Sequence, residues 1–302
     1  MAIVVLVPDS DGVEALRHVA GVSTVRYRVE EPLPDAAGDA EVMVVLYGKV
    51  DRVTGIIRSL PRLRLVQTLN AGYEQWKGRI PEGVLLSNAR GAHGGSSAEW
   101  AVAALLSVYR ELQGFAAAQS GGRWRHHITD LLLGKRVLVL GAGDLAVNLR
   151  RRLEPFEVDT TLVGRRARAG VESIDDLPRL LGDHDAVVVM LPDNEATHHI
   201  VDADFLARMR DGAVLVNVAR GGLVDTEALI VELQRGRLRA ALDVTDPEPL
   251  PGDHPLWRAP GVLITPHVAG ATIGSDDRAW AVAAKQIALF AQGRTPENVV
   301  TF

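Results

Sequence analysis

The stretch Val137-Leu138-Val139-Leu140-Gly141-Ala142-Gly143-Asp144-Leu145-Ala146 decides the fold. Its four apolar residues are typical of a buried parallel strand, and an amphipathic helix is expected over 144–153. Gly141 permits a tight turn between the two elements, and Gly143 lets the backbone approach another group closely. Ala146 takes the position that serves helix–strand packing. A strand, a glycine turn and a helix in this order predict one βαβ unit.

A glycine turn in this setting is typical of a phosphate-binding site. The start of the helix presents free N–H groups and the positive end of the helix dipole to an anion. We therefore expect the pyrophosphate of a dinucleotide to bind at four residues, Gly141, Gly143, Asp144 and Leu145. The alternative is a purely structural turn, and the flanking strand and helix favour binding.

The end of the next expected strand bears on which dinucleotide binds. Proteins that choose NAD usually place a carboxylate there to bind the ribose 2′-hydroxyl. Here the strand ends in Gly164-Arg165-Arg166, with a further arginine at Arg168. Guanidinium groups suit a 2′-phosphate because they offer paired donors to a dianion. Arg165 and Arg166 therefore predict NADP as the cofactor, with NAD possible, and a solvated basic loop is the alternative.

Short apolar runs alternate with helical patterns on both sides of this stretch, which is the rhythm of βα units in parallel sheets. Strands are expected at 3–7, 42–46, 63–68, 83–86, 136–140, 159–163, 186–190, 213–216, 239–242 and 262–264. A nearly all-apolar helix is expected over 98–109, capped by Ser96 or Ser97. An apolar helix of this kind should be buried between domains or subunits. The last residues, 275–302, predict a long helix and a tail.

Composition sets the broad class. At about 150 residues per domain, a chain of 302 residues with 47% hydrophobic and 24% charged residues predicts two globular domains. A net charge of −5 gives no reason to expect nucleic acid or a membrane surface as a partner. The sequence contains no cysteine and no long apolar span, and the run from Ala2 to Pro8 is typical of a strand rather than a signal peptide. A cytoplasmic location is expected.

Three further strand ends each carry one chemically useful residue. Arg220 lies in Asn217-Val218-Ala219-Arg220-Gly221-Gly222, Glu248 in Asp243-Val244-Thr245-Asp246-Pro247-Glu248-Pro249, and His267 in Thr265-Pro266-His267. The carboxyl ends of parallel strands meet along one crevice where ligands bind. An arginine there can clamp a carboxylate, and a carboxylate beside a histidine forms an oriented acid–base pair. Taken singly, each residue is more often structural, but their shared placement favours catalysis.

In these segments and in their order, the chain resembles the D-isomer-specific 2-hydroxyacid dehydrogenase family, which includes glyoxylate/hydroxypyruvate reductases and 3-phosphoglycerate dehydrogenases. The resemblance covers most of the sequence and is densest from Gly134 to Gly270. It implies a hydride transfer between NAD(P)H and a small 2-oxo acid, which yields the matching D-2-hydroxy acid. The sequence leaves the side chain of that acid open.

The resemblance also implies residue roles. Arg220 would bind the substrate carboxylate and polarise the 2-oxo group, His267 would be the general acid or base, and Glu248 would orient the imidazole. The backbone N–H groups of Ala71 and Gly72 would bind the carboxylate as well. Four further cofactor contacts are expected, at Pro192, Thr197, Ala219 and Asp243, with Asp243 beside the nicotinamide carboxamide.

The implied architecture is two Rossmann-like or flavodoxin-like doubly wound parallel-sheet domains with a cleft between them. Residues 1–95 with 271–302 would form a discontinuous substrate domain, and residues 96–270 the dinucleotide domain. The helix after Ser97 would help to form a homodimer. No metal site is expected, since the adjacent His198 and His199 should point apart and lack a partner one helical turn away.

Two rival functions stay open. Formate dehydrogenase is a relative that uses an amide partner for its histidine, and Glu248 argues against it. A regulatory protein that senses the dinucleotide could keep this fold without significant turnover, although no interaction tail is visible.

Overall fold

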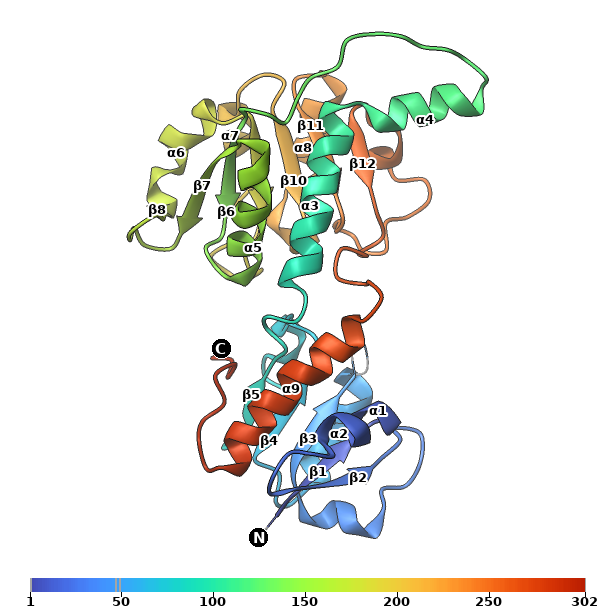
Figure 1. The fold of residues 1–302 in the computed structure, drawn as a ribbon, viewed down its shortest axis with the longest axis vertical. Coiled ribbons are helices and arrows are strands. Elements are labelled where there is room, and N and C mark those ends of the chain that lie inside the picture. The colour runs from blue at the N-terminus through green and yellow to red at the C-terminus, as the bar shows by residue number, and fades with distance from the viewer. Residues whose placement is uncertain (1, 47, 49, 302) are drawn as a thin grey trace. The chain divides into compact units, whose positions relative to one another are not determined.

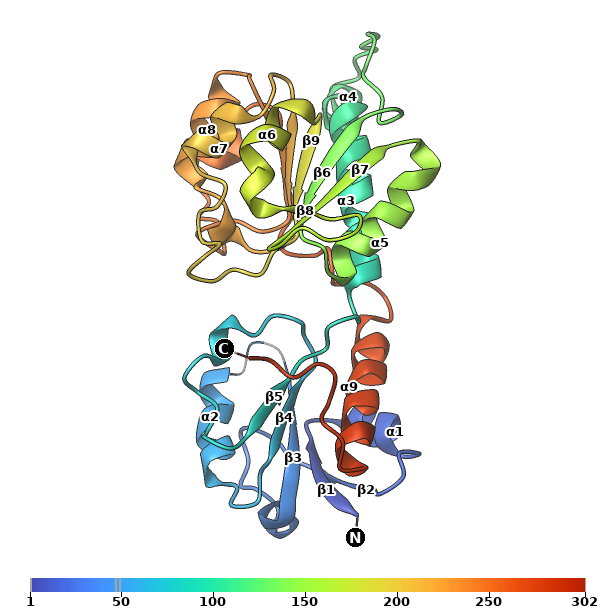
Figure 2. The ribbon, with the colours of Figure 1, turned by 90° about the vertical axis from the view of Figure 1, so that its left-hand side faces the viewer.

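The computed structural model describes residues 2–46, 48 and 50–301. The chain divides into two compact units (Figures 1 and 2), each with its own parallel sheet. The first unit combines Met1–His93 with Ile273–Phe302, and the second is Gly94–Thr272. The predicted fold class, two doubly wound α/β units, is confirmed.

The first unit has a five-stranded sheet in the order β2-β1-β3-β4-β5. All neighbouring strands are parallel, and this order is that of flavodoxin-like folds. The strands are β1 (Ile3–Val7), β2 (Val22–Arg26), β3 (Ala40–Val45), β4 (Leu65–Thr68) and β5 (Leu85–Ser87).

Helices cover both faces of this sheet. They are α1 (Ser10–Leu16), α2 (Val50–Ser59) and α9 (Ser275–Ala291). One core contains α2 residues and Trp76, and the opposite core contains Leu16 with Trp280 and other residues of α9. Both tryptophans are therefore core residues.

The second unit has a seven-stranded sheet in the order β12-β11-β10-β9-β6-β7-β8, again parallel throughout. The chain enters at the central strand, moves to one edge and then crosses to the other, which is the Rossmann arrangement. The strands are β6 (Arg136–Leu140), β7 (Asp159–Gly164), β8 (Glu172–Ser173), β9 (Ala186–Val189), β10 (Val214–Asn217), β11 (Arg239–Leu242) and β12 (Val262–Ile264).

Figure 2 shows this sheet between two helical layers, in agreement with its two buried cores. On one face lie α3 (Gly94–Tyr109) and α5 (Asp144–Leu153), and on the other α6 (Leu177–Leu180), α7 (Ala203–Arg208) and α8 (Thr226–Gln234). A further helix, α4 (Leu112–Ser120), follows α3. The start of α3 at Gly94 corrects the predicted serine cap, because Ser96 and Ser97 lie inside the helix.

Within the described ranges, no helix is both long and apolar enough to cross a membrane.

A buried histidine in the second unit is expected to make its stability depend on pH. His184 is only 1% exposed. Its Nδ1 lies 2.7 Å from the Leu180 carbonyl and its Nε2 lies 3.0 Å from the Thr161 hydroxyl. The carbonyl only accepts, so Nδ1 carries the proton. Burial lowers the pKa of His184 below its usual 6.5, although the bond to Leu180 opposes this shift.

The folded protein therefore favours neutral His184, whereas the unfolded chain binds a proton near pH 6.5. The stabilisation is complete above that pH, and we expect it to be lost as pH falls through the lower pKa of the folded state. Urea unfolding between pH 8 and pH 5 measures this. The variant His184→Gln should show a shallower decline of its midpoint, and an equal decline in both proteins would contradict the assignment.

Candidate active site

The glycine turn between β6 and α5 has the geometry predicted from the sequence. β6 ends at Leu140, and Gly141 has φ +135°. A Cβ there would lie 2.7 Å from the Met190 carbonyl oxygen, so a side chain cannot fit. Gly143 is the N-cap of α5, and a Cβ on it would meet no atom within 4 Å. An open helix start of this kind leaves its first N–H groups available to an anion.

Asp144 points its carboxylate away from that opening. Its Oδ1 accepts a bond of 3.0 Å from the side chain of Asn148. Its Oδ2 occupies the space where a side chain on Gly94 would lie, at the start of α3. The negative charge is thus turned aside, and binding of a pyrophosphate by the backbone of Asp144 and Leu145 stays a prediction. This is the contact that the fingerprint requires.

The basic turn after β7 contains three arginines and no carboxylate. Arg165 and Arg166 are exposed directly after Gly164. Arg168 folds back, and its Nη2 donates to the Ala142 carbonyl of the glycine turn at 3.3 Å. The groups present therefore fit a dinucleotide with a 2′-phosphate.

The loop after β9 contains the predicted contacts Pro192 and Thr197. The Thr197 hydroxyl donates to the Pro192 carbonyl at 2.7 Å and accepts from the Asn194 N–H at 3.0 Å. Thr197 therefore shapes the loop from within. The same loop is tied to the Arg220 segment, since His199 N–H donates to the Gly222 carbonyl at 2.8 Å.

Arg220 follows β10 in a turn that Asn217 organises. The Asn217 side chain is buried, donates to the Arg220 carbonyl at 2.8 Å and accepts from Ala219 N–H at 3.1 Å. Arg220 Nη1 donates to the Ala219 carbonyl at 2.7 Å. The sequence analysis did not predict this role of Asn217. It could have been inferred from the position of an amide side chain at the end of a buried strand, where a polar group needs a hydrogen-bond partner.

Glu248 and His267 form the expected pair. Glu248 Oε1 lies 2.6 Å from His267 Nδ1, and both side chains are partly exposed. A carboxylate only accepts, so Nδ1 donates and a neutral ring has its Nε2 free to exchange a proton. His267 has φ +54°, a left-handed conformation that is uncommon for a residue with a side chain.

Asp243 holds the loop that carries this histidine. It is only 2% exposed. Its Oδ1 accepts from the Thr265 hydroxyl at 2.6 Å and Val268 N–H at 2.9 Å, and its Oδ2 accepts from Ala269 N–H at 2.8 Å. Its carbonyl also accepts from His267 N–H at 2.7 Å. In the structure Asp243 therefore fixes the backbone around His267, and its expected contact with the nicotinamide carboxamide stays a prediction.

A close backbone approach joins the segments of Arg220 and Glu248. A Cβ on Gly221 would overlap the Thr245 carbonyl, so the loop leading to Glu248 rests on the backbone next to Arg220. Thr226 Oγ1 donates to the Asp246 carbonyl at 2.9 Å and secures this contact. The second unit thus brings the three predicted strand ends together.

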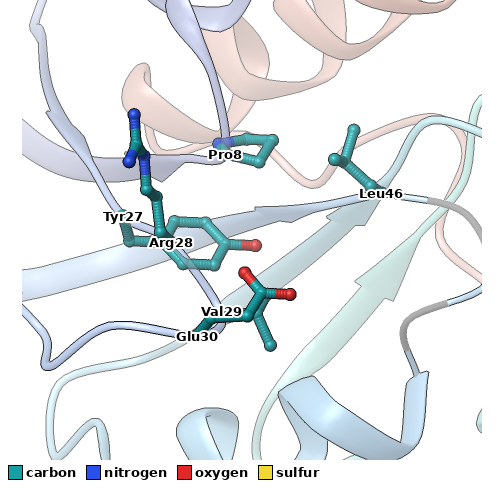
Figure 3. A pocket seen from close by; sticks show the side chains of 6 residues that line it. All are labelled: Pro8, Tyr27, Arg28, Val29, Glu30 and Leu46. Carbon is teal, nitrogen blue, oxygen red and sulfur yellow. The ribbon is translucent and has the colours of Figure 1, made fainter.

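Ala71 and Gly72 lie in the first unit, in the loop that follows β4. Their carbonyls accept side-chain amide bonds of 2.7 Å each, from Asn88 and Asn70 respectively. The same unit has a small pocket of about 70 Å³ (Figure 3), lined by Pro8, Tyr27, Arg28, Val29, Glu30 and Leu46. Its charges are already paired, Arg28 with Glu31 and Glu30 with Arg52.

Known proteins are similar in sequence to this chain. Residues 102–269 match the model of the D-isomer specific 2-hydroxyacid dehydrogenase family, NAD binding domain. A glyoxylate reductase of Thermofilum pendens is 30% identical over 90% of this chain and 84% of its own length. A glyoxylate/hydroxypyruvate reductase B of Yersinia enterocolitica is 30% identical over 89% of this chain and 86% of its own.

Solved structures with the same fold belong to the same family. A D-isomer specific 2-hydroxyacid dehydrogenase of Xanthobacter autotrophicus, in complex with NADPH and MES, superposes with a TM-score of 0.84 at 29% identity, covering 99% of this chain and 98% of the other. An NADPH-dependent glyoxylate/hydroxypyruvate reductase of Sinorhizobium meliloti, in complex with NADP and sulfate, gives 0.82 at 26% identity with the same coverage. The family model and the full-length relatives together show that this chain belongs to the D-isomer specific 2-hydroxyacid dehydrogenase family.

Proposed function

We propose that this protein reduces a small 2-oxo acid of the glyoxylate or hydroxypyruvate type to the D-2-hydroxy acid, with NADPH as the preferred cofactor. The observation that carries the proposal is the 2.6 Å pair of Glu248 and His267. This pair lies in the same unit as Arg220 and an open phosphate-binding turn. The similar proteins named above support the substrate class and the cofactor.

Each residue has a distinct task in this reaction. Arg220 binds the substrate carboxylate and draws electron density toward the 2-oxo oxygen. When bound, the reduced dinucleotide supplies the hydride that the carbonyl carbon accepts. Negative charge then develops on the oxygen, and protonated His267 donates the Nε2 proton to it, giving the hydroxyl group. Glu248 holds Nδ1 and compensates the charge of the imidazolium. In the first unit, the N–H groups of Ala71 and Gly72 donate to the carboxylate.

A panel of 2-oxo acids tests the proposal. Oxidation of NADPH at 340 nm should be fast with glyoxylate or hydroxypyruvate and slower with acids that have bulkier side chains. If no acid on the panel is reduced with either dinucleotide, the alternative of a dinucleotide-sensing regulatory protein is favoured instead. No observation on this chain supports that alternative at present.

The cofactor preference gives a separate prediction. Replacing both Arg165 and Arg166 by alanine should raise the KM for NADPH by about 10- to 100-fold. One charged hydrogen bond to a phosphate contributes roughly 1.5–3 kcal/mol, and solvent screens these two exposed arginines, so we expect a combined loss equal to about one such bond. The KM for NADH should change by less than about threefold, since NADH has no 2′-phosphate. Arg179→Ala, an exposed arginine on α6, is the matched control. A wild-type protein that prefers NADH would refute the assignment.

We also propose that the protein is a homodimer. The supporting observation is a group of exposed apolar side chains on α4 and on the segment that projects from the second unit after it (Figure 1). Trp124 is 97% exposed and Ile128 is 93% exposed. Exposed apolar groups of this kind mark association surfaces. Light scattering should give a dimer for the wild type and a monomer for the double variant Trp124→Ser with Ile128→Ser. The cytoplasmic location stays a prediction from the sequence.

A further inference from the structure

A cluster of buried polar side chains lies at the carboxyl ends of β4 and β5. Within the described part of the first unit, the buried polar side chains all belong to it: Gln67, Thr68, Ser87, Asn88, Gln286 and Asn298. Burial of a polar group costs free energy unless the group finds a hydrogen-bond partner. The concentration of these groups at one place calls for a structural or functional reason.

The chain's C-terminal tail supplies part of the cluster. After α9 it returns antiparallel to β5 (Figure 2). Asn88 N–H donates to the Asn298 carbonyl at 3.2 Å, and Val300 N–H donates to the Leu86 carbonyl at 2.8 Å. The Asn298 N–H donates in turn to the Gln286 side chain of α9 at 3.1 Å. The tail is thus held on both sides.

The side chain of Asn298 ties the tail to the turn after β5. Its Nδ2 donates to the Asn88 carbonyl and to the Arg90 carbonyl, both at 3.0 Å. Its Oδ1 accepts from the Arg90 guanidinium at 3.2 Å. Both ends of the amide are therefore used, and the turn at Asn88 and Arg90 is fixed by a residue more than 200 positions away.

The side chain of Asn88 connects the turn after β5 to the loop after β4. Its Nδ2 donates to the Ala71 carbonyl at 2.7 Å, while its Oδ1 accepts from Arg90 N–H at 3.1 Å. The next carbonyl, that of Gly72, accepts from Asn70 at 2.7 Å. Among residues 2–46, 48 and 50–301, the N–H groups of Ala71 and Gly72 bond to no acceptor. The Gly72 N–H belongs to the same peptide group as the Ala71 carbonyl, which the Asn88 side chain holds. The Ala71 N–H belongs to the peptide group of the Asn70 carbonyl, which accepts from Ala89 N–H at 3.0 Å and from the Thr68 hydroxyl at 2.9 Å. Two fixed peptide groups thus present two unused donors.

We infer that Asn298, acting through Asn88, is a positioning residue that holds the Ala71–Gly72 loop ready for the substrate carboxylate. This inference rests on the proposed function, in which those N–H groups bind the carboxylate. A loop already fixed in its binding conformation loses less conformational entropy when the anion binds. The C-terminal tail therefore contributes to substrate affinity without touching the substrate.

Two nearly isosteric variants test the hydrogen bonds that link Asn298, Asn88 and Ala71. Asn298→Asp replaces the donor to the Asn88 and Arg90 carbonyls by a carboxylate oxygen. Asn88→Asp removes only the donor to Ala71. Each should raise the KM for the 2-oxo acid by about tenfold, the scale expected for one or two lost hydrogen bonds. The kcat should stay within about threefold and the KM for NADPH within about twofold. Glu297→Gln is the control, since its carboxylate pairs with Lys285 on the surface.

Hydrogen exchange gives a second readout that needs no activity. Amides of residues 69–73 should exchange faster in both variants than in the wild type, while those of β6 in the second unit should not change. An unchanged KM, an unchanged exchange rate at 69–73, or a parallel rise of both KM values would each overturn the inference. If the wild type reduces no 2-oxo acid, the proposed function fails, and the exchange rates alone then decide whether the tail orders the loop.

Discussion

Replacing His267 by alanine is expected to lower kcat by about 1000-fold, because proton transfer by a positioned side chain contributes roughly 10²- to 10⁴-fold. The developing alkoxide would have to take its proton from water, which lacks a fixed position beside it. The affinity for the dinucleotide should change by less than about twofold, since the phosphate-binding turn is a separate part of the unit. Steady-state kinetics with titration of NADPH fluorescence measures both quantities.

A control variant and a second active-site variant complete this experiment. His18→Ala replaces an exposed histidine of the first unit and should leave kcat unchanged. Glu248→Gln keeps the shape of the side chain and can still accept from His267 Nδ1, but it removes the negative charge at 2.6 Å. We expect this variant to lose about 10- to 100-fold in kcat. Near-normal turnover in His267→Ala would refute the role of the histidine.

The sequence predicted these residues because the geometry of parallel sheets is regular. Carboxyl ends of neighbouring parallel strands lie along one edge, so residues that end β10, β11 and β12 must be near one another. The register confirms this, with Asn217 opposite Leu242 and Leu242 opposite Ile264. These residues are far apart in the chain, but the prediction depends only on the order of the strands in the sheet.

The hydrogen-bond partners of Asp243 could not be predicted in the same way. They lie 22–26 residues further along the chain, in a loop without a repeating pattern. Whether a carboxylate faces a ligand or its own backbone depends on the path of that loop. The hydrogen bond between Asn298 and Asn88 could not be predicted either, because the two residues are 210 positions apart in the chain. Buried polar contacts between distant loops leave no periodic signal in a sequence.

The fold was predicted best where apolar runs were continuous. β6, β11 and β12 have the predicted bounds. β2 was missed because Val-Ser-Thr-Val-Arg is half polar, which suits the edge of the sheet, where the strand is only partly buried. Helix α4 was missed as well, since Gly114 interrupts it and Gly121 follows it.

Replacing Arg220 by alanine is expected to lower kcat/KM for the 2-oxo acid by about 10³- to 10⁴-fold. Two charge-assisted hydrogen bonds to a carboxylate contribute roughly 1.5–3 kcal/mol each, and the loss of the positive charge beside the 2-oxo oxygen should add a decrease in kcat. The KM for NADPH should stay within about threefold. Arg208→Ala, on the exposed side of α7, is the matched control.

The conservative variant separates charge from shape. Arg220→Lys keeps a positive charge but cannot offer two parallel donors, so we expect it to recover part of kcat and little of the substrate KM. Guanidinium ion added to Arg220→Ala should restore activity in a saturable way, because the turn that Asn217 and Gly221 hold would keep its shape around the vacated space. If Arg220→Ala retains the wild-type kcat/KM, another residue must bind the carboxylate, and the proposed chemistry of this site would have to be abandoned.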